Sequence, residues 1–149
     1  MEHKAIERII SKERLKRLIP ILMRYYYLWG METTLIKLHV PDEILAHFEY
    51  ERVEEISGVI RIHMVEKKDP IHYPKGIIGK GQRSLNGYMS PIELQTFPAK
   101  GKEMFLLLKR RRWKLKGDNK SYFNTYSFCK EGMKATKEFG AFLKEIGRG

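Results

Sequence analysis

Apolar residues recur at helical spacing near both ends of the chain and at strand spacing between them. Over residues 4–29 the apolar positions follow a helical period, with Lys and Arg on the other side, which predicts a helix that Pro20 kinks or ends. Near the other end, Thr136 is a favourable N-cap and Gly147 a natural stop for a second helix. The residues that share one face of this helix are Phe139, Phe142, Leu143 and Ile146.

The region after residue 40 predicts a short helix and then two strands. The helix should run from Pro41 to Phe48, because Pro and Asp favour a helix start. Strands are expected at about 48–54 and 59–66, joined by a turn at Ile56-Ser57-Gly58, since apolar and polar residues alternate with a period of two in the second of them. Residues 67–90 contain closely spaced Pro and Gly pairs, which predict a long loop.

The last third of the chain predicts a three-stranded meander. Its strands are expected at Ile92 to Phe97, Glu103 to Leu115 and Tyr122 to Phe128, with turns rich in Pro, Gly and Asn between them. The predicted fold class is therefore α+β: a small antiparallel β-meander or hairpin domain with an N-terminal helix and a C-terminal helix. No internal repeat is present.

The distribution of charged residues indicates a polyanionic partner. The 149 residues carry a net charge of +11, and residues 98–149 contain 14 Lys and Arg against 5 Asp and Glu. Residues 35–66 are locally acidic, with 7 acidic and 3 basic residues. Such one-sided charge favours a nucleic acid first and an anionic membrane surface second. The best apolar stretch, 18–31, is interrupted by Arg24 and too short to span a membrane, so no transmembrane helix is expected. Of the two candidates, a nucleic acid and not a membrane is the expected partner.

A single run of the sequence, Met104 to Lys116, changes from apolar to basic half way along. At roughly 3.3 Å per residue, the basic half should project some 20–25 Å beyond the packed part as a hairpin arm. Arginine grips phosphate or a guanine edge in two places, and Trp113 could stack on a base. The competing interpretation is a charged edge strand that deters aggregation, which usually needs fewer basic residues. The expected DNA-binding residues are Lys100, Lys102, Lys109, Arg110, Arg111, Arg112, Trp113, Lys114 and Lys116, helped by Lys80 and Arg83.

The sequence contains few features that indicate a metal site, a phosphate-binding loop or a catalytic site. The segment Gly76 to Gln82 is similar to the glycine loop of KH domains but lacks its last glycine, and it is not a P-loop, so a flexible loop is expected. The only cysteine is Cys129, which excludes an internal disulfide and a cysteine-built zinc site and fits a cytoplasmic protein. The five histidines have no ligand-like spacing, and the acidic residues form no metal-binding set. We expect no metal, no cofactor and no catalytic residues.

From about Leu35 to Ile146 the chain resembles the N-terminal region of bacterial insertion-sequence transposases of the ISL-three type, notably the ISAon-type branch. The most specific part runs from Phe97-Pro98 through Gly101-Lys102 to Arg110-Arg111-Arg112-Trp113. Weaker parts are the opening Val40 to Leu45 with Phe48, the strand Ile60 to Ile62, and Thr136 to Phe139 with Phe142 and Leu143.

The resemblance implies a DNA-binding head with catalysis on a separate transposase chain. In that family the two hairpins form a zinc-ribbon-like head. The zinc-ribbon cysteines are missing here, so a metal-free head is implied, in which packing replaces the metal through Leu115, Tyr122, Phe123, Tyr126 and Phe128. Its domains would be 1–34, an N-terminal helical extension, and 35–149, the DNA-binding domain. It would recognise the terminal repeat DNA of a transposable element during DNA recombination, as a monomer or a homodimer, and would not be an enzyme.

Two other functions use the same sequence features. An RNA-binding or regulatory module could present the same basic surface. A protein-interaction adaptor could use the acidic segment 35–66 and the aromatic run Tyr25 to Trp29 to bind a partner. A small-molecule enzyme is disfavoured because no nucleophile, base and orienting group occur together.

Overall fold

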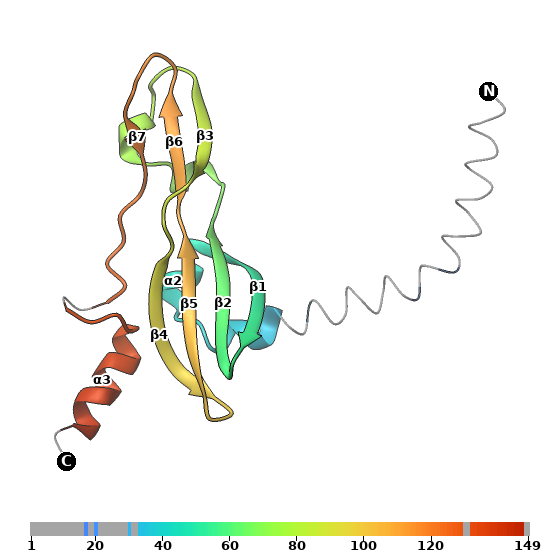
Figure 1. The fold of residues 1–149 in the computed structure, drawn as a ribbon. Coiled ribbons are helices and arrows are strands. Elements are labelled where there is room, and N and C mark those ends of the chain that lie inside the picture. The colour runs from blue at the N-terminus through green and yellow to red at the C-terminus, as the bar shows by residue number, and fades with distance from the viewer. Residues whose placement is uncertain (1–16, 18–19, 21–29, 31–32, 130–131, 148–149) are drawn as a thin grey trace. The chain divides into compact units, whose positions relative to one another are not determined.

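The computed structural model describes residues 17, 20, 30, 33–129 and 132–147, and its fold is α+β (Figure 1). The chain divides into two compact units, Met1–Leu38 and His39–Gly149. In the first unit, residues 33–37 are helical. Almost all of the helix predicted for residues 4–29, and the aromatic run Tyr25 to Trp29, lie outside the described residues. The elements discussed below belong to the second unit.

The larger sheet has four strands, β1 (Phe48–Ile56), β2 (Val59–Glu66), β4 (Ile92–Ala99) and β5 (Lys102–Lys109), in the order β1-β2-β5-β4. The hairpin β1–β2 confirms the two strands predicted there, and β4 confirms the strand predicted from Ile92. The sheet is mixed, because β2 and β5 pair in parallel. The prediction of a purely antiparallel sheet was therefore wrong, although β4 and β5 pair antiparallel as predicted.

The smaller sheet consists of β3 (Arg83–Tyr88), β6 (Arg111–Leu115) and the two-residue strand β7 (Ser121–Tyr122), all antiparallel, with β6 in the centre. Only Arg110 separates β5 from β6, and Met89 N donates to Arg110 O at 2.9 Å across this break. Residues 83–99 and 102–115 therefore form one long antiparallel ribbon that crosses both sheets (Figure 1). The strand predicted from Glu103 to Leu115 is extended throughout but is divided between two sheets.

Two segments differ from their sequence-based predictions. Residues 67–90 are not a single loop, since they contain two 3₁₀ turns, η1 (Pro70–His72) and η2 (Lys75–Ile77), and then β3. The pair Asn86-Gly87 is part of the predicted loop, but Gly87, at a φ of 74°, lies within a register shift of β3. A glycine with positive φ is typical of such a bulge. Of the strand predicted from Tyr122 to Phe128, only Tyr122 belongs to a strand, β7, and residues 123–128 form no regular secondary structure.

Helices cover parts of the larger sheet. The first, α2 (Asp42–Leu45), is shorter than the predicted helix and places Ile44 in the core. The second, α3 (Lys137–Ile146), confirms the prediction: the Thr136 side chain accepts a hydrogen bond from Phe139 N, and the helix ends at Gly147. Just before α3, Thr136 N donates to Gln95 O and Gln95 N donates to Lys134 O, so this segment covers the outer edge of β4.

The core lies against the larger sheet. Alternate residues of β2, β4 and β5 are buried there, which is the period-two pattern that the sequence predicts. The largest fully buried apolar side chains are Phe48, Ile44, Ile62, Met64, Ile77, Leu94, Leu106 and Leu108. None of the helices in the described part of the chain has both the length and the apolar character of a bilayer-spanning segment.

Candidate nucleic-acid interface

The charges of the second unit are divided between its two sheets. Residues 70–90 and 110–129, which build the smaller sheet and are called the basic lobe below, contain nine Lys and Arg but one acidic residue, Asp118. Residues 39–69 and 91–109, which build the larger sheet, contain seven basic and ten acidic residues. The positive field that the sequence indicates is therefore concentrated on the basic lobe.

Alternation along β6 places its basic residues on two opposite faces. Arg111 and Trp113 are buried, whereas Arg112 and Lys114 are half-buried and point the other way. Lys114 lies opposite Ser84 on β3 and opposite Ser121 on β7, both of which are exposed. We call this side of the sheet the outer face. Successive outward residues of a strand are about 7 Å apart, so Arg112, Lys114 and the following Lys116 form a short row of cations.

Arg111 is a structural residue of the junction between the sheets. Its side chain is 9% exposed, its Nε donates to the backbone oxygen of Glu66 at 2.8 Å, and its backbone N donates to the Glu66 carboxylate at 3.2 Å. The guanidinium also lies over the ring of Tyr88. The expected free arm is therefore wrong for Arg111, because the strand continues in a sheet whose inner face is covered.

Trp113 is also part of this covered inner face. Its side chain is 6% exposed and packs edge-to-face on Tyr73, with 4.8 Å between the ring centroids. The guanidinium group of Arg83 lies over the ring of Tyr73, with its carbon atom 4.5 Å from the ring centre. Trp113 is thus a packing residue here and not an exposed surface for stacking a base, which corrects the role expected from the sequence.

Arg112 and Arg110 are held in place by backbone oxygens. Arg112 Nε donates to Asn86 O at 2.7 Å, across the sheet. Arg110 Nη1 donates to Asn124 O at 3.1 Å, and its guanidinium carbon lies 5.4 Å from the centre of the Phe123 ring. Each arginine is therefore oriented, and neither forms an ion pair with a carboxylate of the described residues. Such pre-oriented cations are suited to binding phosphate.

The three remaining lysines of the expected site lie elsewhere. Lys100 occupies the β4–β5 turn with a φ of 52°, and Lys102 begins β5 and forms an ion pair with Glu55. Lys109 ends β5, about 23 Å from Lys102 at the rise of an extended strand. Its ammonium pairs with Glu51 at 3.2 Å and lies over the Tyr88 ring. The fold therefore does not bring Lys100 and Lys102 together with the basic row of β6.

A buried carboxylate, Glu66, joins the two sheets beneath this surface. It is fully buried and accepts hydrogen bonds from Tyr126 Oη, from Asn124 Nδ2 and from the backbone of Arg111. The pKa of Tyr126 is raised, first by burial and then by its hydrogen bond to Glu66. Sequence reasoning missed this cluster, because nothing in the local pattern distinguishes Glu66 from the exposed glutamates of β1.

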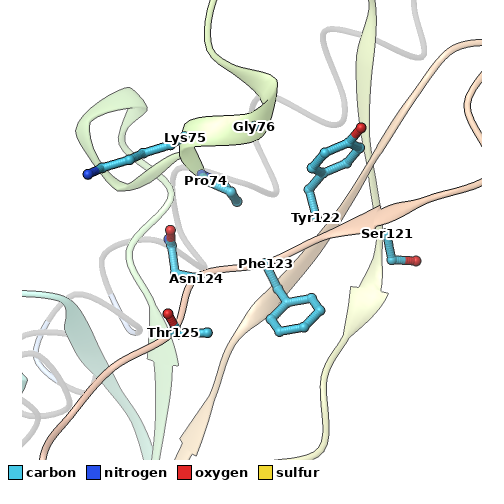
Figure 2. A pocket seen from close by; sticks show the side chains of 8 residues that line it. All are labelled: Pro74, Lys75, Gly76, Ser121, Tyr122, Phe123, Asn124 and Thr125. Carbon is cyan, nitrogen blue, oxygen red and sulfur yellow. The ribbon is translucent and has the colours of Figure 1, made fainter.

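A cavity opens beside β7 at the edge of the basic lobe (Figure 2). Its volume is about 620 Å³, and it lies between η2 and the chain that contains β7. Figure 2 shows the Tyr122 side chain pointing toward the Gly76 turn and the Phe123 side chain leaving the chain on the opposite side. The residues that line it are Pro74, Lys75, Gly76, Ser121, Tyr122, Phe123, Asn124 and Thr125, none of which is acidic.

The wall of this cavity is fixed by close packing and by one strong hydrogen bond. A Cβ atom on Gly76 would lie 2.6 Å from the Tyr122 ring, so the η2 backbone rests directly on that ring. Tyr122 Oη donates to Asp118 at 2.5 Å. This hydrogen bond is the main cause that lowers the pKa of Asp118 and raises the pKa of Tyr122.

The described residues contain no group of three or more His, Cys, Asp and Glu side chains arranged to hold a metal ion. We find no protein-family model, curated protein or solved structure that matches this chain. The interpretation of the basic lobe therefore depends on its geometry and on the residues of the sequence.

Proposed function

We propose that the chain is a DNA-binding module that holds the phosphate backbone on the outer face of the smaller sheet. The observation that carries this proposal is the row Arg112, Lys114 and Lys116, which faces away from the covered side of a lobe with nine basic residues and one acidic residue. Proteins that bind DNA gain most of their affinity by neutralising phosphates with such side chains. A two-stranded β-ribbon also fits the major groove of B-DNA.

The resemblance to transposase N-terminal regions makes the proposal more specific. In it, the chain is the non-catalytic head of a bacterial transposase, recognises the terminal repeat of an insertion sequence, and acts in the cytoplasm with a separate catalytic chain. In this proposal the smaller sheet takes the place of the zinc ribbon of that family. Side-chain packing takes the place of the metal, through the expected residues Leu115, Tyr122, Phe123, Tyr126 and Phe128 and through the contact of Tyr73 with Trp113. Homodimer formation belongs to the same proposal.

The test is salt-dependent binding to a short DNA duplex by two matched double variants. Lys114→Gln with Lys116→Gln removes two charges from the outer face, and Lys134→Gln with Lys144→Gln removes two exposed charges beside and on α3. If each outer-face lysine covers one phosphate, the first variant should reduce the slope of log K against log salt by about two units. The second variant should leave this slope unchanged.

An unchanged slope in the first variant, with the fold intact by circular dichroism, would contradict the proposal. Single-stranded RNA in competition tests the alternative that the same surface serves RNA. Binding to a protein partner that persists at high salt would favour the adaptor function instead, because phosphate contacts weaken as salt rises.

A further inference from the structure

Phe123, the residue after β7, lies on the outer face of the smaller sheet. Within β7, Ser121 lies opposite Lys114 on the outer face. The next residue, Tyr122, lies opposite Trp113 on the covered inner face. Phe123 points outward again, and Figure 2 shows its side chain leaving the chain on the side opposite to that of Tyr122. The ring is therefore on the side of the basic row and not on the side of η2.

The chain after β7 stays beside the central strand, which places this ring next to Arg112. Arg110 Nη1 donates to Asn124 O at 3.1 Å, so the chain still follows the ribbon one residue beyond Phe123. Phe123 also directly follows the last residue pair of the β6–β7 ladder. The antiparallel register therefore brings it opposite Arg112, at a strand spacing of about 5 Å.

The Phe123 ring is exposed and has a cation on one side. Its side chain is 37% exposed, and no aromatic ring among the described residues packs against it. The Arg110 guanidinium carbon lies over the ring, 5.4 Å from its centre. An aromatic ring among cations is the combination with which proteins hold single-stranded nucleic acids, because the ring stacks on a base while the cations bind the backbone.

We propose that Phe123 stacks on an unpaired base of a DNA strand whose phosphates lie on Arg112 and Lys114. This inference rests on the proposed function and makes it more specific, because it predicts which form of DNA the outer face prefers. The bases of a continuous duplex are stacked on one another and offer no free face to the ring. The ring therefore adds affinity only where the DNA has a single-stranded segment. Stacking accepts any base, since every base has a π face.

The experiment measures fluorescence anisotropy with four DNA probes: a blunt duplex, the same duplex with a short 3′ overhang, one with a short 5′ overhang, and each overhang made abasic. Wild-type protein should bind one of the overhang probes about tenfold more tightly than the blunt duplex, the gain expected from stacking one base. The abasic overhang has the same phosphates but no bases, so it should lose this gain.

Equal affinity for the blunt and overhang probes would overturn the inference and leave the proposed function standing. A gain that persists with the abasic overhang would also overturn it, because the gain would then come from phosphates alone. Failure of the wild-type protein to bind any probe would overturn the proposed function together with the inference.

Variants of Phe123 then test the ring itself. Phe123→Leu keeps an apolar side chain beside Arg110 but removes the π face, so it should abolish the preference for an overhang and keep the affinity and salt slope for the blunt duplex. Phe142→Leu, at an aromatic position of α3 with 43% exposure, is the matched control and should keep the preference. A preference that survives Phe123→Leu in a protein folded by circular dichroism would overturn the inference.

Phe123→Trp provides a second readout at the same position. The indole keeps a stacking surface, so the preference for an overhang should remain. The fluorescence that this variant adds to that of the wild type should be quenched by the overhang probe and not by the blunt duplex. Equal quenching by the two probes would contradict stacking on an unpaired base.

Discussion

At the scale of single residues, one position along β6 separates a structural arginine from a surface arginine. Arg111 is buried against Glu66 and Tyr88, and Arg112 is half-buried on the opposite face and contacts Asn86. Both have the same side-chain chemistry, so their roles differ only because successive residues of a strand point to opposite sides. Substitutions that treat the run Arg110 to Arg112 as a unit would mix effects on folding with effects on binding.

The first prediction concerns the buried carboxylate of Glu66. The Glu66 carboxylate accepts hydrogen bonds from Tyr126, Asn124 and the Arg111 backbone. Glu66→Gln replaces one of its acceptor oxygens by an NH₂ group, which cannot accept. We expect a loss of about 1–3 kcal/mol in the free energy of unfolding, because a buried polar group is left without a partner. Urea denaturation measures this loss. Glu103→Gln, at an exposed position of β5, is the control and should change stability by less than about 0.5 kcal/mol.

The second prediction concerns the pH dependence of the Asp118–Tyr122 pair. The pKa of Asp118 is lowered in the folded protein, chiefly by the hydrogen bond from Tyr122. The pair therefore stabilises the fold above the unfolded pKa of the carboxyl group, and this contribution disappears as pH falls through the lowered folded pKa. Asp118→Asn should flatten the acid side of a plot of melting temperature against pH. An unchanged acid side would show that the pair contributes nothing measurable.

At the scale of elements, the long ribbon of residues 83–99 and 102–115 determines how the basic lobe is held. β4 and β5 are anchored in the core of the larger sheet, and their direct continuations β3 and β6 build the smaller sheet. The edge of β4 is covered by residues 134–136, which lead into α3. A strand edge that is paired in this way is protected from association with other chains.

The third prediction concerns the start of α3. The fully buried hydroxyl of Thr136 accepts a hydrogen bond from Phe139 N, and its backbone pairs with Gln95. Thr136→Ala removes the cap but keeps the backbone pairing, so the expected loss is about 0.5–2 kcal/mol in the free energy of unfolding. Ser127→Ala, at an exposed position outside a helix, is the control for chemical denaturation. Equal midpoints for both variants would contradict a capping role.

At the scale of the whole second unit, the two sheets differ in charge as well as in pairing. Acidic residues on β1 pair with Lys102 and Lys109, so these lysines of the larger sheet are partly neutralised, whereas the outer face of the smaller sheet keeps its charge. A polyanion should therefore approach the smaller sheet and be repelled by the acidic strand β1.

The fourth prediction uses this difference in charge to locate bound DNA. Acetylation of surface lysines, read out by mass spectrometry, should slow several-fold at Lys114 and Lys116 when DNA is present, because bound phosphates screen their ammonium groups. Lys134 and Lys144 should react at the same rate with and without DNA. Uniform protection of all four lysines would indicate binding without a defined surface.

The local sequence pattern was sufficient to predict much of the fold but only part of the candidate site. The strands at Phe48–Ile56, Val59–Glu66 and Ile92–Ala99 and the helix at Lys137–Ile146 follow from periodicity and capping, which are local properties. β3 could not be recognised, because the sequence RSLNGY has turn residues and acquires its strand geometry only by pairing with β6. The cavity beside β7 depends on η2 resting on Tyr122, a contact between segments far apart in the chain.

The sequence by itself determined the α+β class, the alternation that builds the core and the concentration of positive charge after residue 97, since each depends only on residue types and their spacing. Tertiary structure alone decided that β2 and β5 run parallel, that the basic run is divided at Arg110, and that Arg111 and Trp113 face inward. The physical reason is that the pairing of distant strands sets which face of a strand is covered. A charge pattern along the chain does not contain that information.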